Sequence, residues 1–292
     1  MKAQPTGPFP YSPIHKRKKL SWPNNARVAL WVIPNIEHFA LNEALPPTTG
    51  TAAGKIPDVF SYSMRDYGNR VGIWRLIDVM SRYNIRGTVA LNSDICDYCP
   101  DIIEETVKLD WEFMGHNESN TRRLNQNPDT EHDIIKKTLD RIEKATGKRP
   151  KGWLGSGLQE TWNTLDYLIE EGCTYVADWV NDDQPYRMNI DGKQIVSIPY
   201  SGEINDKVLF DSFSFSSAEF EKVVRDQFDV LYEEGAQSGR VMAIALHPYI
   251  IGVPHRIRAL DAALKYICAH EGVWLATGEE IINSYLSQTQ GD

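Results

Sequence analysis

The chain has 292 residues, of which 41% are hydrophobic and 24% are charged, and its formal net charge is −9. This length allows one large α/β barrel or two ordinary domains, with enough apolar residues for a sizeable core. The negative charge argues against nucleic acid or an anionic membrane as the main partner. The sequence has no apolar run of about 18 residues and no apolar signal core at its start, so we expect no membrane span and a cytoplasmic location.

Residues 1–26 are predicted to form an irregular N-terminal arm, because they are rich in proline and carry a basic run. The rest of the chain, residues 27–292, is predicted to be a single domain, since no internal repeat or low-complexity linker interrupts it. The basic run at residues 15–19 is interpreted as a solvated part of the arm. A patch for nucleic acid or lipid is the less favoured alternative.

Beyond the arm, short apolar runs of the kind that form buried strands alternate with helical patterns. The predicted strands are residues 28–33, 87–91, 111–115, 152–154, 175–179, 195–199, 241–246 and 273–276. The clearest predicted helices are residues 130–145, 217–234 and 257–269. This alternation is typical of parallel strands with helices outside. Seven or eight such units in one series predict an α/β fold, a closed or distorted (β/α)7-8 barrel, in preference to an open sheet.

Local signals also mark helix ends and one long loop. Ser217 is predicted to be the N-cap of helix 217–234, and Gly147 is predicted to stop helix 130–145. Residues 34–69, which include the Pro-Pro-Thr-Thr-Gly run at 46–50, show no strong periodicity. A loop of that length inside a compact enzyme is usually a lid or a wall of the site.

Two histidines follow predicted strands, and they are the first candidates for chemistry. His116 follows strand 111–115, and His247 follows strand 241–246. The carboxyl ends of parallel barrel strands converge on one rim, where active sites form. A single histidine after a strand is more often structural, but two at two strand ends favour a functional interpretation. A neutral imidazole binds Zn²⁺ well and also transfers protons near neutral pH.

Acidic and basic residues after other elements extend this set. Glu37 follows the first strand and is interpreted as a metal ligand or general base, with a solvated turn as the alternative. Arg65 and Asp66 precede a predicted helix at residue 71, where they form a helix-start salt bridge or, alternatively, Arg65 offers planar donors to a substrate carbonyl or oxyanion. Asp182 belongs to a carboxylate cluster at residues 178–183, which indicates acid–base partners or a turn.

Two further motifs have less specific interpretations. The run Gly-Trp-Leu-Gly-Ser-Gly at residues 152–157 is neither a phosphate-binding loop nor a nucleophile elbow, and its glycines are expected to let the chain pass close to a ligand. Cys96 and Cys99 form a Cys-x-x-Cys pair without a second pair at zinc-site spacing. We expect reduced thiols there; a redox pair or metal site is the alternative.

At these residues the chain resembles the polysaccharide deacetylase, or NodB-homology, superfamily, and within it the allantoinase-like branch. Members of that branch hydrolyse amide bonds in small cyclic ureides and imides. The resemblance covers residues 27–285, and it implies a distorted (β/α) barrel. The motifs that carry it are Asn35-x-Glu37, the Arg-Asp-Tyr-Gly-Asn-Arg-Val-Gly run at 65–72, Glu112-Phe-Met-Gly-His116, the 152–157 run, Asn181-Asp-Asp-x-Pro-Tyr186, Glu203-x-Asn-Asp206 and Leu246-His-Pro248.

The chain departs from the metal-dependent sugar deacetylases of this superfamily. Asn35 stands where their base aspartate would be, Glu37 replaces the ligand aspartate, and Asn120 replaces the second of two histidines four residues apart. Their Arg-x-x-Pro-x-Gly motif is also absent. The resemblance therefore implies a divalent metal, with Zn²⁺ the first candidate, held more weakly by Glu37, His116 and Asn120. Compensation by His38, a harder or labile metal, and no metal at all are the alternatives.

The sequence thus predicts a metal-dependent hydrolase of a non-peptide C–N bond that opens the ring of a small imide or ureide. His247 is expected to protonate the departing nitrogen, and the base is Asp66, Asp182 or Glu37. The expected substrate contacts are Arg65, Tyr67, Trp153, Trp179 and Asn205. An N-deacetylase and a degenerate, non-catalytic ligand-binding barrel are the alternatives. A small-molecule substrate is the expected partner, and the resemblance implies a homodimer or homotetramer.

Overall fold

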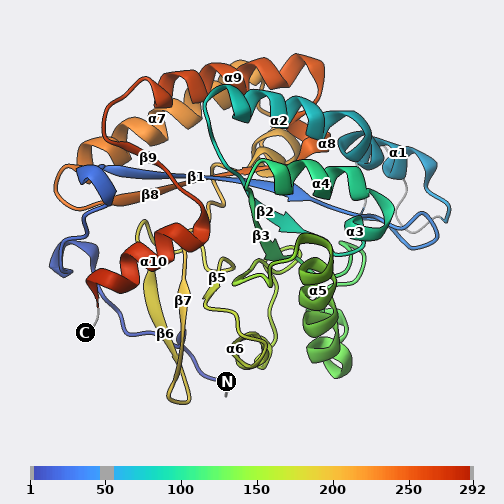
Figure 1. Cartoon of the computed structure of the whole chain (residues 1–292), viewed down its shortest axis with the longest axis horizontal. Helices are drawn as coiled ribbons and strands as arrows, with labels where there is room; N and C mark the ends of the chain where they lie inside the picture. Colours follow the sequence, from blue (N-terminus) through green and yellow to red (C-terminus); the bar gives the residue numbers. More distant parts are fainter. Residues whose placement is uncertain (1–2, 47–55, 290–292) are drawn as a thin grey trace.

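The computed structural model describes residues 3–46 and 56–289, which fold around one curled sheet (Figure 1). Its hydrogen-bonded order is β6-β7-β5-β4-β3-β2-β1-β8, and β9 also pairs with β1. All of these pairs are parallel except β6 with β7. The predicted α/β fold of the distorted barrel type is therefore confirmed. The strands are β1 (Val28–Ile36), β2 (Thr88–Leu91), β3 (Glu112–Gly115), β4 (Gly152–Trp153), β5 (Tyr175–Val176), β6 (Tyr186–Ile190), β7 (Lys193–Ser197), β8 (Arg240–Leu246) and β9 (Val273–Leu275).

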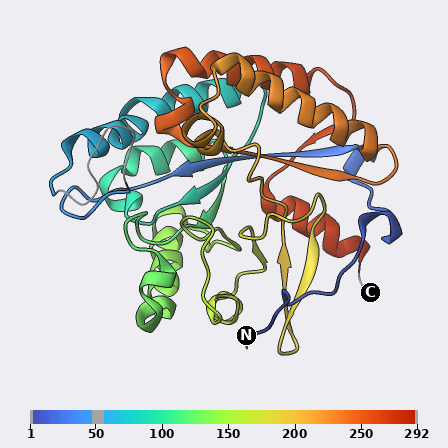
Figure 2. The same ribbon diagram turned by 180° about the vertical axis from the view of Figure 1, so that it is seen from behind.

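Helices cover the outside of this sheet. In Figures 1 and 2, α2, α7 and α9 lie together over β1 and β8, while α5 lies on the opposite side of the molecule. Phe220, Val224, Phe228 and Leu231 form a buried stripe on α7, as expected for an amphipathic helix. The helices are α1 (Val59–Tyr67), α2 (Ile73–Arg82), α3 (Ile95–Tyr98), α4 (Pro100–Lys108), α5 (Glu131–Thr146), α6 (Thr164–Glu170), α7 (Ser217–Gly235), α8 (Pro248–Ile251), α9 (Pro254–Cys268) and α10 (Gly278–Gln288).

The strand register brings the carboxyl ends of β1, β2, β3 and β8 to one rim. Pro34 of β1 lies opposite Leu246 of β8, and Ile36 lies opposite Leu91 of β2, which in turn lies opposite Gly115 of β3. The residues that follow these strands therefore meet at the same end of the sheet. The interior below this rim is filled by side chains such as Trp31 and Tyr175, so it is a packed core.

β6 and β8 are the first and last strands in the hydrogen-bonded order of the sheet, and the N-terminal arm runs from one to the other (Figures 1 and 2). The backbone N–H of Asn189 in β6 donates to Pro8 O at 2.9 Å, and Trp22 Nε1 donates to Arg240 O of β8 at 2.8 Å. Arg17 binds both carboxylate oxygens of Asp182 at 2.7 and 2.6 Å. The expectation of a wholly solvated basic run is therefore wrong at Arg17, because a carboxylate of the barrel holds its guanidinium.

Several predicted boundaries need correction. The N-cap of α7 is Ser216, one residue before Ser217, because Ser216 forms a capping box with Glu219. The strand β6 was not predicted; it pairs antiparallel with β7 in a hairpin. The stop of α5 at Gly147 is confirmed by its left-handed φ of +77°.

The predicted loop 34–69 is also shorter than expected. β1 extends to Ile36, and residues 59–67 form α1, which continues through a π-helical turn at Gly68–Gly72 into α2. Most of the proline-threonine run at 46–50 lies outside the described residues. No helix in the described part of the chain is both long and apolar enough to cross a membrane.

Candidate functional site

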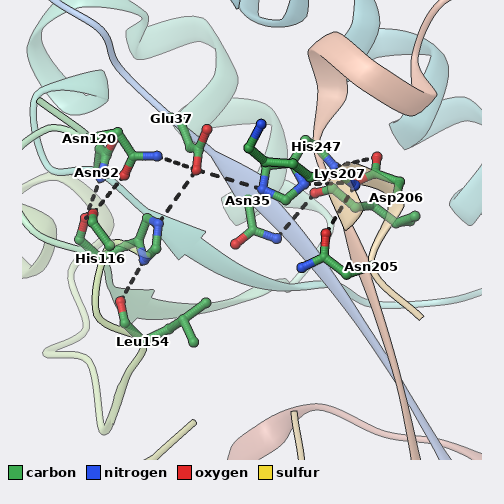
Figure 3. Close-up of polar contacts among 12 residues, drawn as sticks. Asn35, Glu37, Asn92, His116, Asn120, Leu154, Asn205, Asp206, Lys207 and His247 are labelled. Carbon is green, nitrogen blue, oxygen red and sulfur yellow. Dashed lines mark hydrogen bonds and ion pairs between the residues drawn. The ribbon is translucent and has the colours of Figure 1, made fainter. Parts of the chain in front are cut away.

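Glu37, His116 and His247 lie together at the carboxyl-end rim (Figure 3). They follow β1, β3 and β8, respectively, and their residues are only 7%, 3% and 5% exposed. Glu37 Oε1 lies 3.6 Å from His116 Nε2 and 3.7 Å from His247 Nε2. The strand register that joins β1 with β8 and, through β2, with β3 explains why residues so far apart in sequence meet here. One carboxylate oxygen is thus faced by two imidazole nitrogens.

The other ring nitrogen of each histidine is fixed by an acceptor. His116 Nδ1 lies 2.5 Å from Leu154 O, and His247 Nδ1 lies 2.6 Å from Asp206 Oδ1. A carbonyl oxygen can only accept, so His116 Nδ1 carries a proton, and the ionised carboxylate of Asp206 assigns the same role to His247 Nδ1. When either ring is neutral, its Nε2 therefore presents a lone pair to Glu37. A proton or another positive group is needed between such partners.

The electrostatics of Glu37 follow from this arrangement. Burial acts to raise its pKa, but the charge of His247 and the hydrogen bond and charge of His116 outweigh burial and lower the pKa below its ordinary value. Glu37 is therefore ionised at neutral pH. Its backbone O also accepts a hydrogen bond from Asn69 Nδ2 at 2.9 Å, which ties the end of β1 to the π-helical turn after α1.

His247 is held by a buried carboxylate. Asp206 accepts from His247 Nδ1 at 2.6 Å and from the His247 backbone N–H at 2.8 Å. Burial acts to lower the pKa of His247, but the charges of Asp206 and Glu37 raise it above its ordinary value. Burial raises the pKa of Asp206 above its ordinary value. The charge and hydrogen bonds of His247 act in the opposite direction but offset this rise only in part. We take the ion-pair state, with Asp206 ionised and His247 protonated, as dominant, because two bonds converge on that carboxylate.

Asn120 does not have the orientation expected of a metal ligand. Its Nδ2 donates to Glu37 Oε1, and its Oδ1 accepts from Ser156 Oγ at 2.6 Å and from Asn92 Nδ2 at 3.5 Å. The amide therefore turns its hydrogens toward the carboxylate and its oxygen away from it. In the part of the chain that the structure describes, no three His, Cys, Asp or Glu side chains are spaced to hold a metal ion. The donor set as arranged does not fit the predicted divalent metal site.

Glu37 also lines a cleft of about 550 Å³ next to the histidines. The predicted residues Arg65 and Asp66 line this cleft too, whereas His116 and His247 contact Glu37 without being among its lining residues. Asp66 forms an ion pair with Arg70, so it is not free to act as a base. The flat walls of the cleft include Phe39, Tyr62, Trp74 and Tyr98. Glu37 is thus the point at which the cleft meets the two imidazoles.

Three predicted site residues lie elsewhere. Asp182 binds Arg17, and the neighbouring Asp183 O accepts from the backbone N–H of Val241. This contact places Asp182 near the amino end of β8, the opposite end from His247, so its prediction as a catalytic residue is wrong. Trp153 is fully buried in a core cluster below Gly115, and so it cannot form a substrate wall. Tyr67 accepts from Arg75 Nη1 at 2.5 Å and is absent from the cleft lining.

Two other predicted substrate contacts lie near the rim but outside the cleft lining. Trp179 donates from Nε1 to Glu160 Oε1 at 3.1 Å and packs edge-on against Phe9. Asn205 Oδ1 accepts from the Lys207 backbone N–H at 3.0 Å (Figure 3). The backbone of Asn205 also forms a parallel bridge with Ala245 of β8. Asn205 therefore fixes the turn that carries Asp206.

Sequence reasoning gave too little weight to the residues that hold the site together. Asp206 was named only as part of the Glu203-x-Asn-Asp206 motif, yet it accepts two hydrogen bonds from His247. Asn92 and Ser156 bind the His116 carbonyl oxygen and Asn120, and no sequence signal identified them. Their position one or a few residues beyond β2 and β4 is the only available signal. A search for polar residues directly after each predicted barrel strand would have identified Asn92.

Asp178 and Glu160 form a second group of carboxyls beside the site. Asp178 Oδ1 accepts from the Gly155 backbone N–H at 2.7 Å, which accords with a close approach of the chain at this glycine. Burial raises the pKa of Asp178 to about 6, and burial and the charge of Asp178 raise the pKa of Glu160 well above its ordinary value. Burial and the neighbouring carboxylate thus favour the protonated form of Glu160. The cysteines are free, and burial raises the pKa of Cys96 to about 11, so its thiol is protonated.

Comparisons with known proteins show which proteins this chain is similar to. Residues 57–176 match the polysaccharide deacetylase family model. A Schizosaccharomyces pombe protein, named provisionally as a polysaccharide deacetylase, is 27% identical over 90% of this chain and 92% of its own length. A Pseudomonas aeruginosa PAO1 crystal structure, described as a probable polysaccharide deacetylase, has a TM-score of 0.87 and 27% identity over 94% of this chain and 96% of that one. The crystal structure of PuuE allantoinase also has a TM-score of 0.87, with 26% identity over 95% of this chain and 96% of that one.

The matched segment includes β2 to β5 and His116, and the similarities to the S. pombe protein and to the two crystal structures extend over 90–95% of the chain. Both the sugar-deacetylase and the allantoinase similarities were expected from the motifs of the sequence. Residues 57–176 match the polysaccharide deacetylase family model, and most of the chain is similar to proteins described as polysaccharide deacetylases of this NodB-homology type.

Proposed function

We propose that this protein is a hydrolase of a non-peptide C–N bond that opens the ring of a small cyclic amide, an imide or a ureide. The similarity to deacetylases and to PuuE allantoinase supports C–N bond hydrolysis. The observation that carries the proposal is the approach of two imidazole Nε2 atoms to one oxygen of Glu37 at the inner end of a cleft. A cleft of about 550 Å³ with aromatic walls suits a small, flat ring.

The chemistry can be assigned to residues of this chain. Glu37 is ionised and faces the cleft, so it takes the proton of the attacking water while the oxygen of that water bonds to the ring carbonyl carbon. The tetrahedral intermediate then collapses, the C–N bond breaks, and the departing nitrogen takes a proton from the Glu37–His247 pair. His247, whose pKa Asp206 raises, is the source of that proton. The proton on Glu37 then restores His247 across the 3.7 Å between Oε1 and Nε2.

Asn35 cannot serve as the base. Its amide nitrogen points to Leu246 O at 3.3 Å and to Tyr200 Oη at 3.4 Å, and an amide takes no proton from water at neutral pH. Asn120 donates an N–H to Glu37 and thereby stabilises its anionic form. A bound cation would stabilise the same anionic form. These two substitutions and the orientation of Asn120 favour acid–base activation by protein groups in place of a bound ion.

The proposal is tested by assaying ring opening of succinimide, hydantoin and allantoin with wild-type protein and with Glu37→Gln. The glutamine keeps the size of the side chain and removes the base. We expect at least one ring to be opened and a roughly 100- to 10,000-fold loss of kcat in the variant, as for removal of a general base. If the wild-type protein opens none of the three rings, the substrate assignment is wrong.

An N-deacetylase is the second candidate, and the family-model match at residues 57–176 favours it. Attack of water on an acetamide carbonyl would use Glu37 and His247 in the same way. Release of acetate from N-acetylglucosamine oligomers distinguishes the two functions. Acetate release faster than any ring opening would make the deacetylase the correct assignment.

A further inference from the structure

Arg65 in the last turn of α1 carries a buried positive charge. The residue is only 4% exposed. Its Nη1 donates to Ser61 O at 3.0 Å and its Nη2 donates to Pro46 O at 2.8 Å, so both acceptors are neutral carbonyls. The guanidinium carbon lies 4.6 Å from the centre of the Phe39 ring. Buried guanidinium groups are usually paired with an anion, because neutral partners compensate only part of the lost hydration.

No carboxylate of the described residues supplies that anion. None of their Asp or Glu oxygens forms an ion pair with Arg65 within 4.0 Å. The adjacent Asp66 is bound by Arg70, and Asp58 accepts from the Ser61 backbone N–H as the N-cap of α1. The segment 47–55 contains neither Asp nor Glu, so it cannot contribute a carboxylate either. Among the described residues, no carboxylate neutralises the positive charge of Arg65, and a group from outside the chain can do so.

Arg65 lines the same cleft as Glu37. A guanidinium has five N–H donors, and the two carbonyls use only two of them. Its Nε is buried and has no acceptor among the described residues. The other arginine of the cleft, Arg70, is held by Asp66. A substrate that reaches Glu37 therefore meets a guanidinium that has unused donors and no carboxylate partner among the described residues, in a cleft that Glu37, Asp66 and Asp101 also line.

We propose that the substrate is a cyclic amide that carries an anionic oxygen group, such as a ring carboxylate, and that Arg65 binds this group while Glu37 acts on the ring. The proposal rests on the ring-opening function proposed above and adds the charge of the substrate to it. The planar fork of an arginine matches a carboxylate, and a charged bond formed away from bulk water is about twice as strong as a neutral one. The aromatic side chains of the cleft would hold the ring.

A matched pair of substrates tests the inference. Hydantoin-5-acetic acid and hydantoin share the same ring and differ in the carboxylate. We expect the wild-type protein to open the acid with the higher kcat/KM. Arg65→Gln is expected to lower kcat/KM for the acid roughly 10- to 100-fold and to change the value for hydantoin much less. Arg65→Lys keeps the positive charge but lacks the planar fork of the guanidinium. Its kcat/KM for the acid is expected to lie between those of the wild-type protein and Arg65→Gln.

Arg70→Gln is the matched control, because it removes the same charge from the same cleft but from a guanidinium that is already paired. It is expected to change the acid-to-neutral ratio by less than about twofold, since exposed pairs contribute little. Thermal melting of each variant shows whether it folds. Should Arg65→Gln fail to fold, Arg65→Lys still reports the loss of the fork.

The outcomes separate the inference from the function on which it rests. If the wild-type protein opens hydantoin as well as its acetic acid derivative, the inference is wrong while ring opening stands. If it opens neither, the proposed function fails, and calorimetric binding of the two compounds still tests Arg65. Equal affinity for the acid and the neutral ring, or an acid affinity unchanged in Arg65→Gln, overturns the inference.

Discussion

The link between Asp206 and His247 gives the sharpest prediction, and Asp206→Asn is the substitution that tests it. Asp206 accepts two N–H groups of His247 with its two oxygens, at 2.6 and 2.8 Å. An asparagine has one side-chain oxygen, so one of these donors must lose its acceptor whichever way the amide turns. A hydrogen bond to a charged group is worth about 1.5–3 kcal/mol, which corresponds to a roughly 10- to 100-fold loss of kcat.

The pH dependence of Asp206→Asn has a defined sign. The charge of Asp206 is the first of the effects that raise the pKa of His247, so its removal lowers that pKa. His247 acts as a proton source, and activity is therefore lost as pH rises through its pKa. We expect the alkaline limb of the kcat profile to move to lower pH in the variant, with a smaller loss of activity in acid than at neutral pH. An NMR titration of the His247 ring checks the same shift without substrate. An unmoved alkaline limb, or a limb moved to higher pH, would refute the role assigned to Asp206.

The remaining predictions concern the metal, the arm and the core. Dialysis against a chelator is expected to leave activity unchanged; a loss that added Zn²⁺ restores would show that the donor set does bind a metal. Asp182→Asn is expected to keep kcat/KM within about twofold while lowering the melting temperature by a few degrees, because its partner Arg17 anchors the arm far from Glu37; a large loss of kcat would return Asp182 to the site. Trp153→Ala is expected to cost about 3–5 kcal/mol of unfolding free energy in a denaturant titration, as for a buried aromatic side chain, and a neutral effect would contradict its burial.

The sequence allowed the barrel and the meeting of three site residues to be predicted. The runs that became β1, β3 and β8 are short and almost entirely apolar, which is typical of parallel strands buried on both faces. Because parallel barrel strands end at one rim, Glu37, His116 and His247 could be placed together before any coordinates. Of the hairpin formed by β6 and β7, only β7 was predicted. β6 was missed because its polar residues Arg187 and Asn189 interrupt any continuous apolar run.

Side-chain direction was the part that sequence could not provide. Asp182 and Asp178 are four residues apart after the same strand, and yet Asp178 contacts Gly155 beside the site while Asp182 binds Arg17 at the other end of β8. The path of an irregular segment depends on distant partners, here the N-terminal arm. Trp153 was misplaced for a related reason, because adjacent residues of a strand point to opposite faces and the short β4 gave no pattern from which to choose.

The orientation of Asn120 ties the substitutions in this chain to a single electrostatic argument. A carboxylate faced by two imidazole lone pairs is stable only if something positive lies near its oxygen. Asp206 keeps a proton on His247, and Asn120 adds an N–H to Glu37 Oε1 while Ser156 and Asn92 fix its oxygen on the far side. An aspartate at position 120 would remove that donor and place two carboxylates together. The amide at position 120 and the Asp206–His247 pair therefore act jointly, and a barrel with this pair of features can keep Glu37 ionised with protein groups alone.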